Sequence, residues 1–194
     1  MDCNQHKDKK DEELAALSLK EQGFYLCLMK RYEGKLLRYI MRISSFPKED
    51  AEDILQEVFI KTYQNLNDFD AEFKFSSWIY RIAHNQTISH FRKTKARPET
   101  VNFEVGEESL INLIADGLDM AKEFDRAQLS KKVKKALELL DGKYKDPLVL
   151  KFLEEKDYAE IAYILKKPMG TVATLISRAK KKLRDKILEK NIKF

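Results

Sequence analysis

The fold is decided by the stretch YAEIAYILKKPMGTVATLISRAKKKLR, residues 158–184. Apolar residues recur every three or four positions in its first half, and Pro168 and Gly170 interrupt that period. Thr171 then suits the N-cap or the first turn of a second helix, which has an apolar stripe on one side and cations on the other. This pattern is typical of a DNA-binding helix-turn-helix, although a helical hairpin kept soluble by its lysines has the same pattern.

The rest of the chain is also predicted to be helical. Only six Gly and four Pro interrupt the 194 residues, and long segments carry a helical period without the alternation of strands. We therefore expect an all-α protein made of two small domains. The predicted parts are a polar N-terminal tail at 1–13, a helical domain at 14–97, a linker at 98–125 and a domain at 126–194 that contains the helix-turn-helix. Within the first domain, breaks are expected near Gly23, at 44–47 and at 67–74.

Charge is distributed unevenly along the chain, whose net charge is +5. Segment 99–125 has eight acidic residues against one basic residue, whereas 81–97 has five Arg or Lys and no acid, and 166–186 has eight against one. Two cationic stretches that flank an acidic linker predict two separate contacts along one nucleic acid, with the linker repelled by the phosphates. A solvated helix face is the alternative for either stretch considered alone.

Neither a catalytic site nor a metal site is expected. Cys3 and Cys27 lack the number and spacing of a disulfide framework or a zinc site, so both are expected to be free thiols in a reducing, cytoplasmic compartment. His6, His84 and His90 lack convergent acidic or Cys residues, and no phosphate-cradling glycine loop occurs, so we expect no enzyme activity and no cofactor. No apolar run reaches the roughly 20 residues that span a bilayer, so membrane insertion is not expected.

An acidic helix is predicted at 47–66. One side of it carries an apolar stripe, and the opposite side is rich in carboxylates and amides. The helix dipole accounts for the acids of the first turn, but Gln56 and Glu57 lie beyond that turn. If exposed, these two side chains can hydrogen-bond the Arg side chains and backbone groups of a partner protein. The apolar stripe consists of Ala51, Ile54, Leu55, Val58, Phe59, Thr62 and Leu66.

An aromatic loop precedes a helix with a basic end in the segment FDAEFKFSSWIYRIAHNQTISHFRKTK, residues 69–95. Aromatic rings stack on unpaired bases for about 1–3 kcal/mol each, and cations next to them hold the nucleic-acid backbone. The alternative is that the rings fill a small core. On the helix itself we expect Trp78, Ile79 and Ile82 to belong to the core.

Three motifs resemble those of bacterial RNA polymerase sigma factors of the two-domain, extracytoplasmic-function (ECF) type. They are DAEDILQEVF at 50–59, FSSWIYRIAHN at 75–85, and YAEIAYIL at 158–165 followed by PMGTVATLISRAKKKL at 168–183. The motifs occur in the family's order and cover nearly the whole chain. The resemblance implies a promoter-specificity subunit that has no chemistry of its own. Such a subunit binds core polymerase, recognises the minus-35 and minus-10 promoter elements and opens the DNA, and an anti-sigma factor is its usual regulator.

The resemblance also implies roles for particular residues. Contact with the beta-prime clamp helices of core polymerase would fall on Asp53, Gln56 and Glu57, and the beta subunit flap would be a second polymerase contact. Minus-10 DNA, with one base flipped into a pocket at 70–75, would meet Asp70, Phe73, Phe75, Asn85, Ser89, Arg92 and Lys93. Minus-35 DNA would meet Thr171, Ala173, Thr174, Ser177, Arg178 and Lys181. The acidic linker resembles the family's connector, which threads the polymerase cleft.

Two positions depart from the family, in which the residues at Ala173 and Leu175 are usually basic. Two contacts to DNA are therefore missing, and these side chains would instead touch a thymine methyl or pack against the domain. The lysine run 180–182 supplies phosphate contacts but reads no bases. Two other functions compete with the sigma factor: a stand-alone helix-turn-helix regulator that binds duplex DNA as a dimer, and a decoy that sequesters a regulator.

Overall fold

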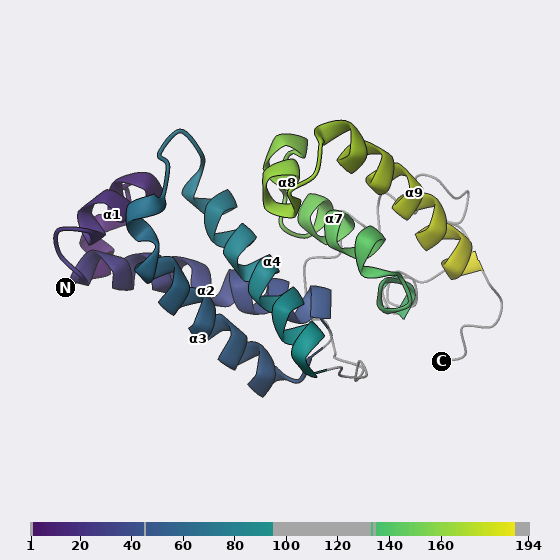
Figure 1. Ribbon diagram of the computed structural model, residues 1–194, viewed down its shortest axis with the longest axis horizontal. Helices are drawn as coiled ribbons and strands as arrows, with labels where there is room; N and C mark the ends of the chain where they lie inside the picture. The colour runs from purple at the N-terminus through teal and green to yellow at the C-terminus, as the bar shows by residue number, and fades with distance from the viewer. Residues whose placement is uncertain (1, 45, 95–132, 134, 189–194) are drawn as a thin grey trace. The chain divides into compact units, whose positions relative to one another are not determined.

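The computed structural model describes residues 2–44, 46–94, 133 and 135–188 (Figure 1). These residues form helices and no strand, which confirms the predicted all-α class. The chain divides into two compact units, Met1–Val101 and Asn102–Phe194. The linker predicted at 98–125 lies outside the described residues, as do the boundaries predicted at its two ends, so these boundaries stay predictions.

The first unit is a group of helices with short connections (Figure 1). The predicted breaks are confirmed, because one helix begins at Gly23, the next begins after Pro47, and a loop precedes the helix that begins at Phe75. Glycine and proline are poor residues for a helix interior, so they mark the boundaries between helices in the sequence. In chain order the elements are η1 (Cys3–His6), α1 (Asp11–Ser18), α2 (Gly23–Ser44), α3 (Lys48–Gln64), η2 (Leu66–Asp68) and α4 (Phe75–Thr94).

The core of the first unit forms where α2, α3 and α4 pack against one another. Every residue of the apolar stripe predicted on α3 is buried, from Ala51 to Leu66. Thr62 is accommodated there because its hydroxyl donates a hydrogen bond to the Val58 carbonyl at 2.7 Å. Tyr39 from α2 and Ile79 from α4 are among the largest fully buried side chains, so the three helices share one core.

The N-terminal segment is attached to this core, which corrects the prediction of free thiols. Cys3 and Cys27 form a disulfide, with their Cα atoms 5.2 Å apart. Next to it, the rings of His6 and Phe24 lie 5.1 Å apart. The two cysteines are 24 residues apart in sequence, and only the packing of η1 on α2 brings them together. Most of the predicted polar tail at 1–13 is therefore docked on the first unit, and α1 already begins at Asp11.

The second unit contains the predicted helix-turn-helix. Its described part includes α7 (Gly142–Phe152), α8 (Tyr158–Leu165) and α9 (Met169–Leu188), and α9 packs on both α7 and α8. Its buried core cluster consists of Val133, Ala136, Leu137, Leu140, Leu148, Ala179, Leu183 and Ile187. This core covers one side of α9 and leaves the other side free to carry polar residues.

The turn between α8 and α9 is built from local hydrogen bonds and one unusual backbone conformation. Asp157 and Glu160 form a reciprocal capping box at the start of α8, at 2.8 and 2.9 Å. Lys166 ends the helix in the left-handed region, with φ of 52°. Helix α9 begins at Met169, so Thr171 lies in its first turn, one of the two positions predicted for it. The turn thus fixes where α9 points relative to α8.

Two buried tyrosines link stability of the first unit to pH. Burial raises the pKa of Tyr25 and of Tyr32 well above the ordinary value near 10. The Tyr25 hydroxyl donates to the Phe59 carbonyl at 2.6 Å, and the Tyr32 hydroxyl donates to the Asp11 carboxylate. Because both pKa values are raised on folding, the neutral phenols contribute fully below about pH 10, and that contribution falls as pH rises further.

We therefore expect the free energy of unfolding to fall as pH rises above about 10. Tyr25→Phe removes one raised pKa and should make this alkaline loss shallower. At neutral pH the same variant should be less stable by about 0.5–1.5 kcal/mol, because one buried hydrogen bond to the Phe59 carbonyl is lost. Urea unfolding at about pH 7 and about pH 11 measures both effects. Tyr63→Phe, at a more exposed position on α3, is the control; an unchanged alkaline slope in Tyr25→Phe would contradict the assignment.

Candidate nucleic-acid interface

The outer face of α3 carries the acidic and amide side chains for which the resemblance implied contact with polymerase. Asp53, Gln56 and Glu57 are all exposed, on the side of the helix away from the buried stripe. The same face continues one turn later through Ile60 and then Tyr63, because residues three and four apart are neighbours on a helix. A polar surface therefore passes directly into an apolar one along α3.

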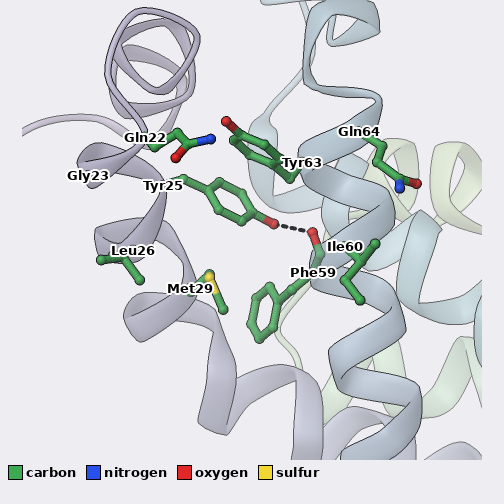
Figure 2. A pocket seen from close by; sticks show the side chains of 9 residues that line it. All are labelled: Gln22, Gly23, Tyr25, Leu26, Met29, Phe59, Ile60, Tyr63 and Gln64. Carbon is green, nitrogen blue, oxygen red and sulfur yellow. Dashed lines mark hydrogen bonds between the residues drawn. The ribbon is translucent and has the colours of Figure 1, made fainter.

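That apolar surface borders a hollow of about 500 Å³ between α2 and α3 (Figure 2). Figure 2 shows Leu26 and Met29 on α2 across from Phe59 and Ile60 on α3, with the Tyr25 hydroxyl bonded to the Phe59 carbonyl. Leu26 and Ile60, which both line this hollow, are 52% and 57% exposed, which is high for large apolar side chains. The complete lining is Gln22, Gly23, Tyr25, Leu26, Met29, Phe59, Ile60, Tyr63 and Gln64.

Phe75, for which the resemblance implied contact with minus-10 DNA, lies in the core of the first unit. Its side chain is 0% exposed. The Phe75 ring packs against Phe69 at 5.4 Å, Trp78 at 5.7 Å and Tyr32 at 5.7 Å between ring centroids. These are favourable distances for aromatic pairs, so Phe75 anchors the loop before α4 to the core. The core alternative for the aromatic segment is thus right at this position.

The loop that this anchor holds presents Asp70 and Phe73 to the outside. Phe73 is 45% exposed, and Asp70 is exposed too. The Asp70 carboxylate accepts a hydrogen bond from the Glu72 backbone N–H at 2.9 Å, and the Asp70 carbonyl accepts one from the Phe73 N–H at 3.1 Å. Asp70 therefore shapes the turn that carries Phe73, and the exposed part of the Phe73 ring is of the kind that can stack on a base.

Helix α4 continues this surface with the polar residues predicted for it. Asn85, Ser89, Arg92 and Lys93 are all exposed, and their spacing of three or four residues keeps them close together on the helix. The opposite side holds the buried residues Tyr80, Ala83 and Thr87. The two cations also lie in the last turn of α4, where they stabilise the negative end of the helix dipole.

The start of α4 is capped by a residue that the sequence did not identify. The Glu12 carboxylate, from α1, accepts a hydrogen bond from the Phe75 backbone N–H at 2.8 Å. An N-terminal N–H of a helix has no partner within the helix, so this carboxylate supplies one from 63 residues away. No local pattern announces such a cap, because the capping boxes readable in a sequence lie within four residues.

On α9 the structure brings the predicted minus-35 residues onto exposed positions. The buried side is formed by Val172, Ile176, Ala179 and Leu183. Leu175 is half-buried, in agreement with packing against the domain. The exposed residues are Thr171, Ala173, Thr174, Ser177, Arg178 and Lys181.

Part of the lysine run on α9 is engaged within the domain. The Lys180 ammonium lies over the Phe152 ring at 5.1 Å, and the Lys182 ammonium lies over the Tyr144 ring at 5.3 Å. These are cation–π distances, and the aromatic partners come from α7. Lys181 and Lys182 are nevertheless exposed, whereas Lys180 is half-buried. The sequence showed the charges but not these partners, which hold two of the three lysines against the second unit.

Neither a cluster of metal-ligating side chains nor a membrane-spanning helix occurs among the described residues. Across the ranges that the structure describes, no three His, Cys, Asp or Glu side chains are grouped to hold a metal ion. None of the helices described above is both long and apolar enough to cross a bilayer. The exposed side chains of α4 and α9 include cations that can bind phosphates.

Comparison with protein families matches both units. The Sigma-70 region 2 model matches residues 28–97, and the Sigma-70 region 4 model matches residues 130–183. The ECF RNA polymerase sigma factor SigW of Bacillus subtilis is 35% identical over 170 residues, which cover 86% of this chain and 90% of SigW. The chain belongs to the ECF sigma factors. The ECF RNA polymerase sigma-E factor of Haemophilus influenzae is 30% identical over 168 residues, covering 82% of this chain and 85% of the relative.

Two solved structures share the fold of this chain. CnrH, solved in complex with the cytosolic domain of CnrY, has a TM-score of 0.64 at 24% identity and covers 90% of this chain and 95% of its own. RpoE of Bartonella quintana, solved in complex with the anti-sigma factor NepR, has a TM-score of 0.62 at 20% identity and covers 82% of this chain and 93% of its own. As a sigma factor, the chain is a promoter-specificity subunit of bacterial RNA polymerase.

The different burial of Phe73 and Phe75 gives a direct test of the loop. Phe75→Ala should lower the free energy of unfolding by about 3–5 kcal/mol, because it opens a cavity among three rings. Phe73→Ala should cost less than about 1 kcal/mol and instead weaken binding of single-stranded minus-10 DNA by polymerase that carries this sigma factor. Urea unfolding and strand-binding titrations separate the two effects. Equal stabilities of the two variants would contradict the burial argument.

Proposed function

We propose that this sigma factor acts through three separate exposed surfaces, one for polymerase and two for promoter DNA. The observation that carries the proposal is that α3, α4 and α9 each bury one side in a core and present polar residues on the other. The protein works in the cytoplasm, where core polymerase is found. It performs no chemistry itself and supplies positioning and recognition.

The polymerase surface is the outer face of α3. Asp53, Gln56 and Glu57 offer carboxylates and an amide to the cations and backbone groups of the beta-prime clamp helices. The adjoining hollow, with Leu26 and Ile60 at its rim, adds apolar contact beside the polar one. In a protein–protein interface, polar groups orient the partner and the adjoining apolar surface is buried against it, so a polar patch next to an apolar hollow suits such a contact. The beta subunit flap is the proposed second polymerase contact.

The minus-10 surface consists of the loop after η2 and the exposed side of α4. Phe73 is placed to stack on a base taken out of the duplex, and Asp70 shapes the turn that presents it. Asn85 and Ser89 lie further along α4 and offer hydrogen bonds to the separated strand. Arg92 and Lys93 at the end of the helix bind its phosphates. The Phe75 ring and the Glu12 carboxylate support the loop from the core side, and neither is proposed to contact DNA.

The minus-35 surface is the exposed side of α9. Among the residues implied for this role, only Arg178 carries a guanidinium group, which can hydrogen-bond a guanine in the major groove through two nitrogens. Thr171 and Ser177 supply short polar groups, and Ala173 suits a thymine methyl. The Thr174 hydroxyl already donates to the Gly170 carbonyl at 2.9 Å, so it meets DNA as an acceptor. Lys181 adds phosphate affinity.

An anti-sigma factor is the proposed regulator. RpoE of Bartonella quintana, which shares the fold of this chain, was solved in complex with the anti-sigma factor NepR. Such a regulator would cover the polymerase surface and the DNA surfaces of this chain. A stand-alone dimeric regulator is not favoured, because the first unit matches sigma region 2, which such a regulator does not need.

The polymerase surface is tested by the double variant Gln56→Ala with Glu57→Ala. We expect it to weaken binding to core polymerase by about tenfold or more. Removal of the Gln56 amide and the Glu57 carboxylate would leave the polymerase groups that they bind unpaired in the interface. Fluorescence anisotropy of the labelled full chain titrated with core polymerase measures the affinity.

The matched control is Gln5→Ala with Glu13→Ala, which removes one amide and one carboxylate from exposed positions at the N-terminal end. It should bind core polymerase as the parent chain does. Equal affinities for parent, control and α3 variant would rule out the role proposed for this face of α3.

A further inference from the structure

The N-terminal segment, residues 2–13, contributes only the Glu12 cap to the function proposed so far. It precedes the region 2 match, which begins at residue 28. Within it, η1 is joined to α2 by the Cys3–Cys27 disulfide, and α1 packs on α2 and α4 (Figure 1). Cys27 is 2% exposed, whereas Cys3 is half-buried, so only one of the two sulfurs is open to reagents in solution.

Arg31 holds the chain that follows the disulfide. It lies one helical turn after Cys27 on α2, and its guanidinium donates to four groups of the segment. One nitrogen donates to the Lys9 carbonyl at 2.8 Å and to the Asp11 carboxylate at 2.6 Å. The other donates to the His6 carbonyl at 2.6 Å and the Lys7 carbonyl at 3.0 Å. These bonds form only when the segment lies against α2, which is the position the disulfide enforces.

The far end of the segment reaches the loop proposed to bind minus-10 DNA. Asp11 accepts a hydrogen bond from the Tyr32 hydroxyl, and the Tyr32 ring packs against Phe75 at 5.7 Å. The next residue, Glu12, accepts the Phe75 backbone N–H at 2.8 Å. The disulfide, the Arg31 contacts and the Glu12 cap thus form one continuous path from Cys3 to the first residue of α4.

We propose that Cys3 and Cys27 form a thiol–disulfide switch that fixes the N-terminal segment when oxidised and, through the Glu12 cap, orders the loop before α4. Reduction leaves the segment held only by non-covalent contacts at a chain end, where fraying is easiest. The loop and the start of α4 then lose part of their support. The step from an ordered loop to DNA binding rests on the proposed function, whereas the step from the disulfide to the loop does not.

The chemistry is exchange with a small disulfide such as oxidised glutathione. The Cys3 thiolate attacks one sulfur, the glutathione S–S bond breaks, and one glutathione thiol is released. Cys27 then attacks the mixed disulfide at Cys3, forms the Cys3–Cys27 bond and releases the second glutathione. Two protein thiols are oxidised, one disulfide is reduced, and the two protons of the cysteines end on the released thiols. In a compartment kept reducing by thiols, such a bond is formed transiently and reports a change of redox state.

The test uses the full chain equilibrated in excess oxidised or excess reduced glutathione. Alkylation and mass spectrometry count the free thiols, and hydrogen exchange follows the backbone N–H of Phe75. We expect no free thiol in the oxidised sample and two in the reduced one. Exchange at Phe75 should be about tenfold faster after reduction. The midpoint of thermal unfolding should fall by roughly 10 °C, because the open chain no longer carries the cross-link.

Two variants separate the switch from a general loss of stability. Cys3→Ser, at the half-buried end, should behave like the reduced chain and no longer respond to oxidised glutathione. Glu12→Ala keeps both cysteines but removes the cap, so Phe75 should exchange fast in both redox states while the thermal midpoint still rises on oxidation. A chain that keeps two free thiols in excess oxidised glutathione, or a Phe75 exchange rate that is the same in both states, overturns the proposal.

Binding of single-stranded minus-10 DNA by core polymerase carrying the oxidised or reduced chain completes the test. We expect severalfold tighter binding in the oxidised state. If Phe75 exchange responds to redox state but neither form binds the strand, the switch stands and the function proposed for the loop fails. If both forms bind equally and Phe75 exchange is also unchanged, the switch fails and the proposed function stands.

Discussion

The burial of Phe75 is the constraint on which the first unit depends. This side chain is fully buried where α2, the loop after η2 and α4 meet, and it contacts an aromatic ring from each of them. Large aromatic rings supply much of the buried area of a small core. Because the loop is anchored by Phe69 and Phe75 at its two ends, the residues between them face outward. The core therefore determines which ring is exposed, and of Phe73 and Phe75 that ring is Phe73.

The same division between core and partner recurs on each helix proposed to function. A helix that packs along one stripe necessarily exposes the opposite one, and the residues there are free of packing constraints. The exposed stripe of α3 carries acidic and then apolar side chains, whereas that of α9 carries short polar side chains and cations. The surface of α9 is further limited because Lys180 and Lys182 lie over rings of α7. Recognition by α9 thus depends on few side chains.

Periodicity and helix-breaking residues allowed much of the fold to be predicted from the sequence. The stripe on α3, the breaks at Gly23 and Pro47, and the turn before α9 are local features, and the structure agrees with each. The misses are long-range. Nothing in an aromatic loop distinguishes Phe73 from Phe75, and nothing in their spacing pairs Cys3 with Cys27, because both outcomes are set by tertiary packing.

The most direct measurement of the central claim is run-off transcription with core polymerase and a genomic promoter library, with and without this protein. If the three surfaces act together, we expect new start sites whose upstream sequences share two elements at a fixed spacing. One element would be bound by α4 with its loop, and the other by α9. Absence of new start sites, in spite of folded protein that binds core polymerase, would contradict the account. So would start sites that share only one element.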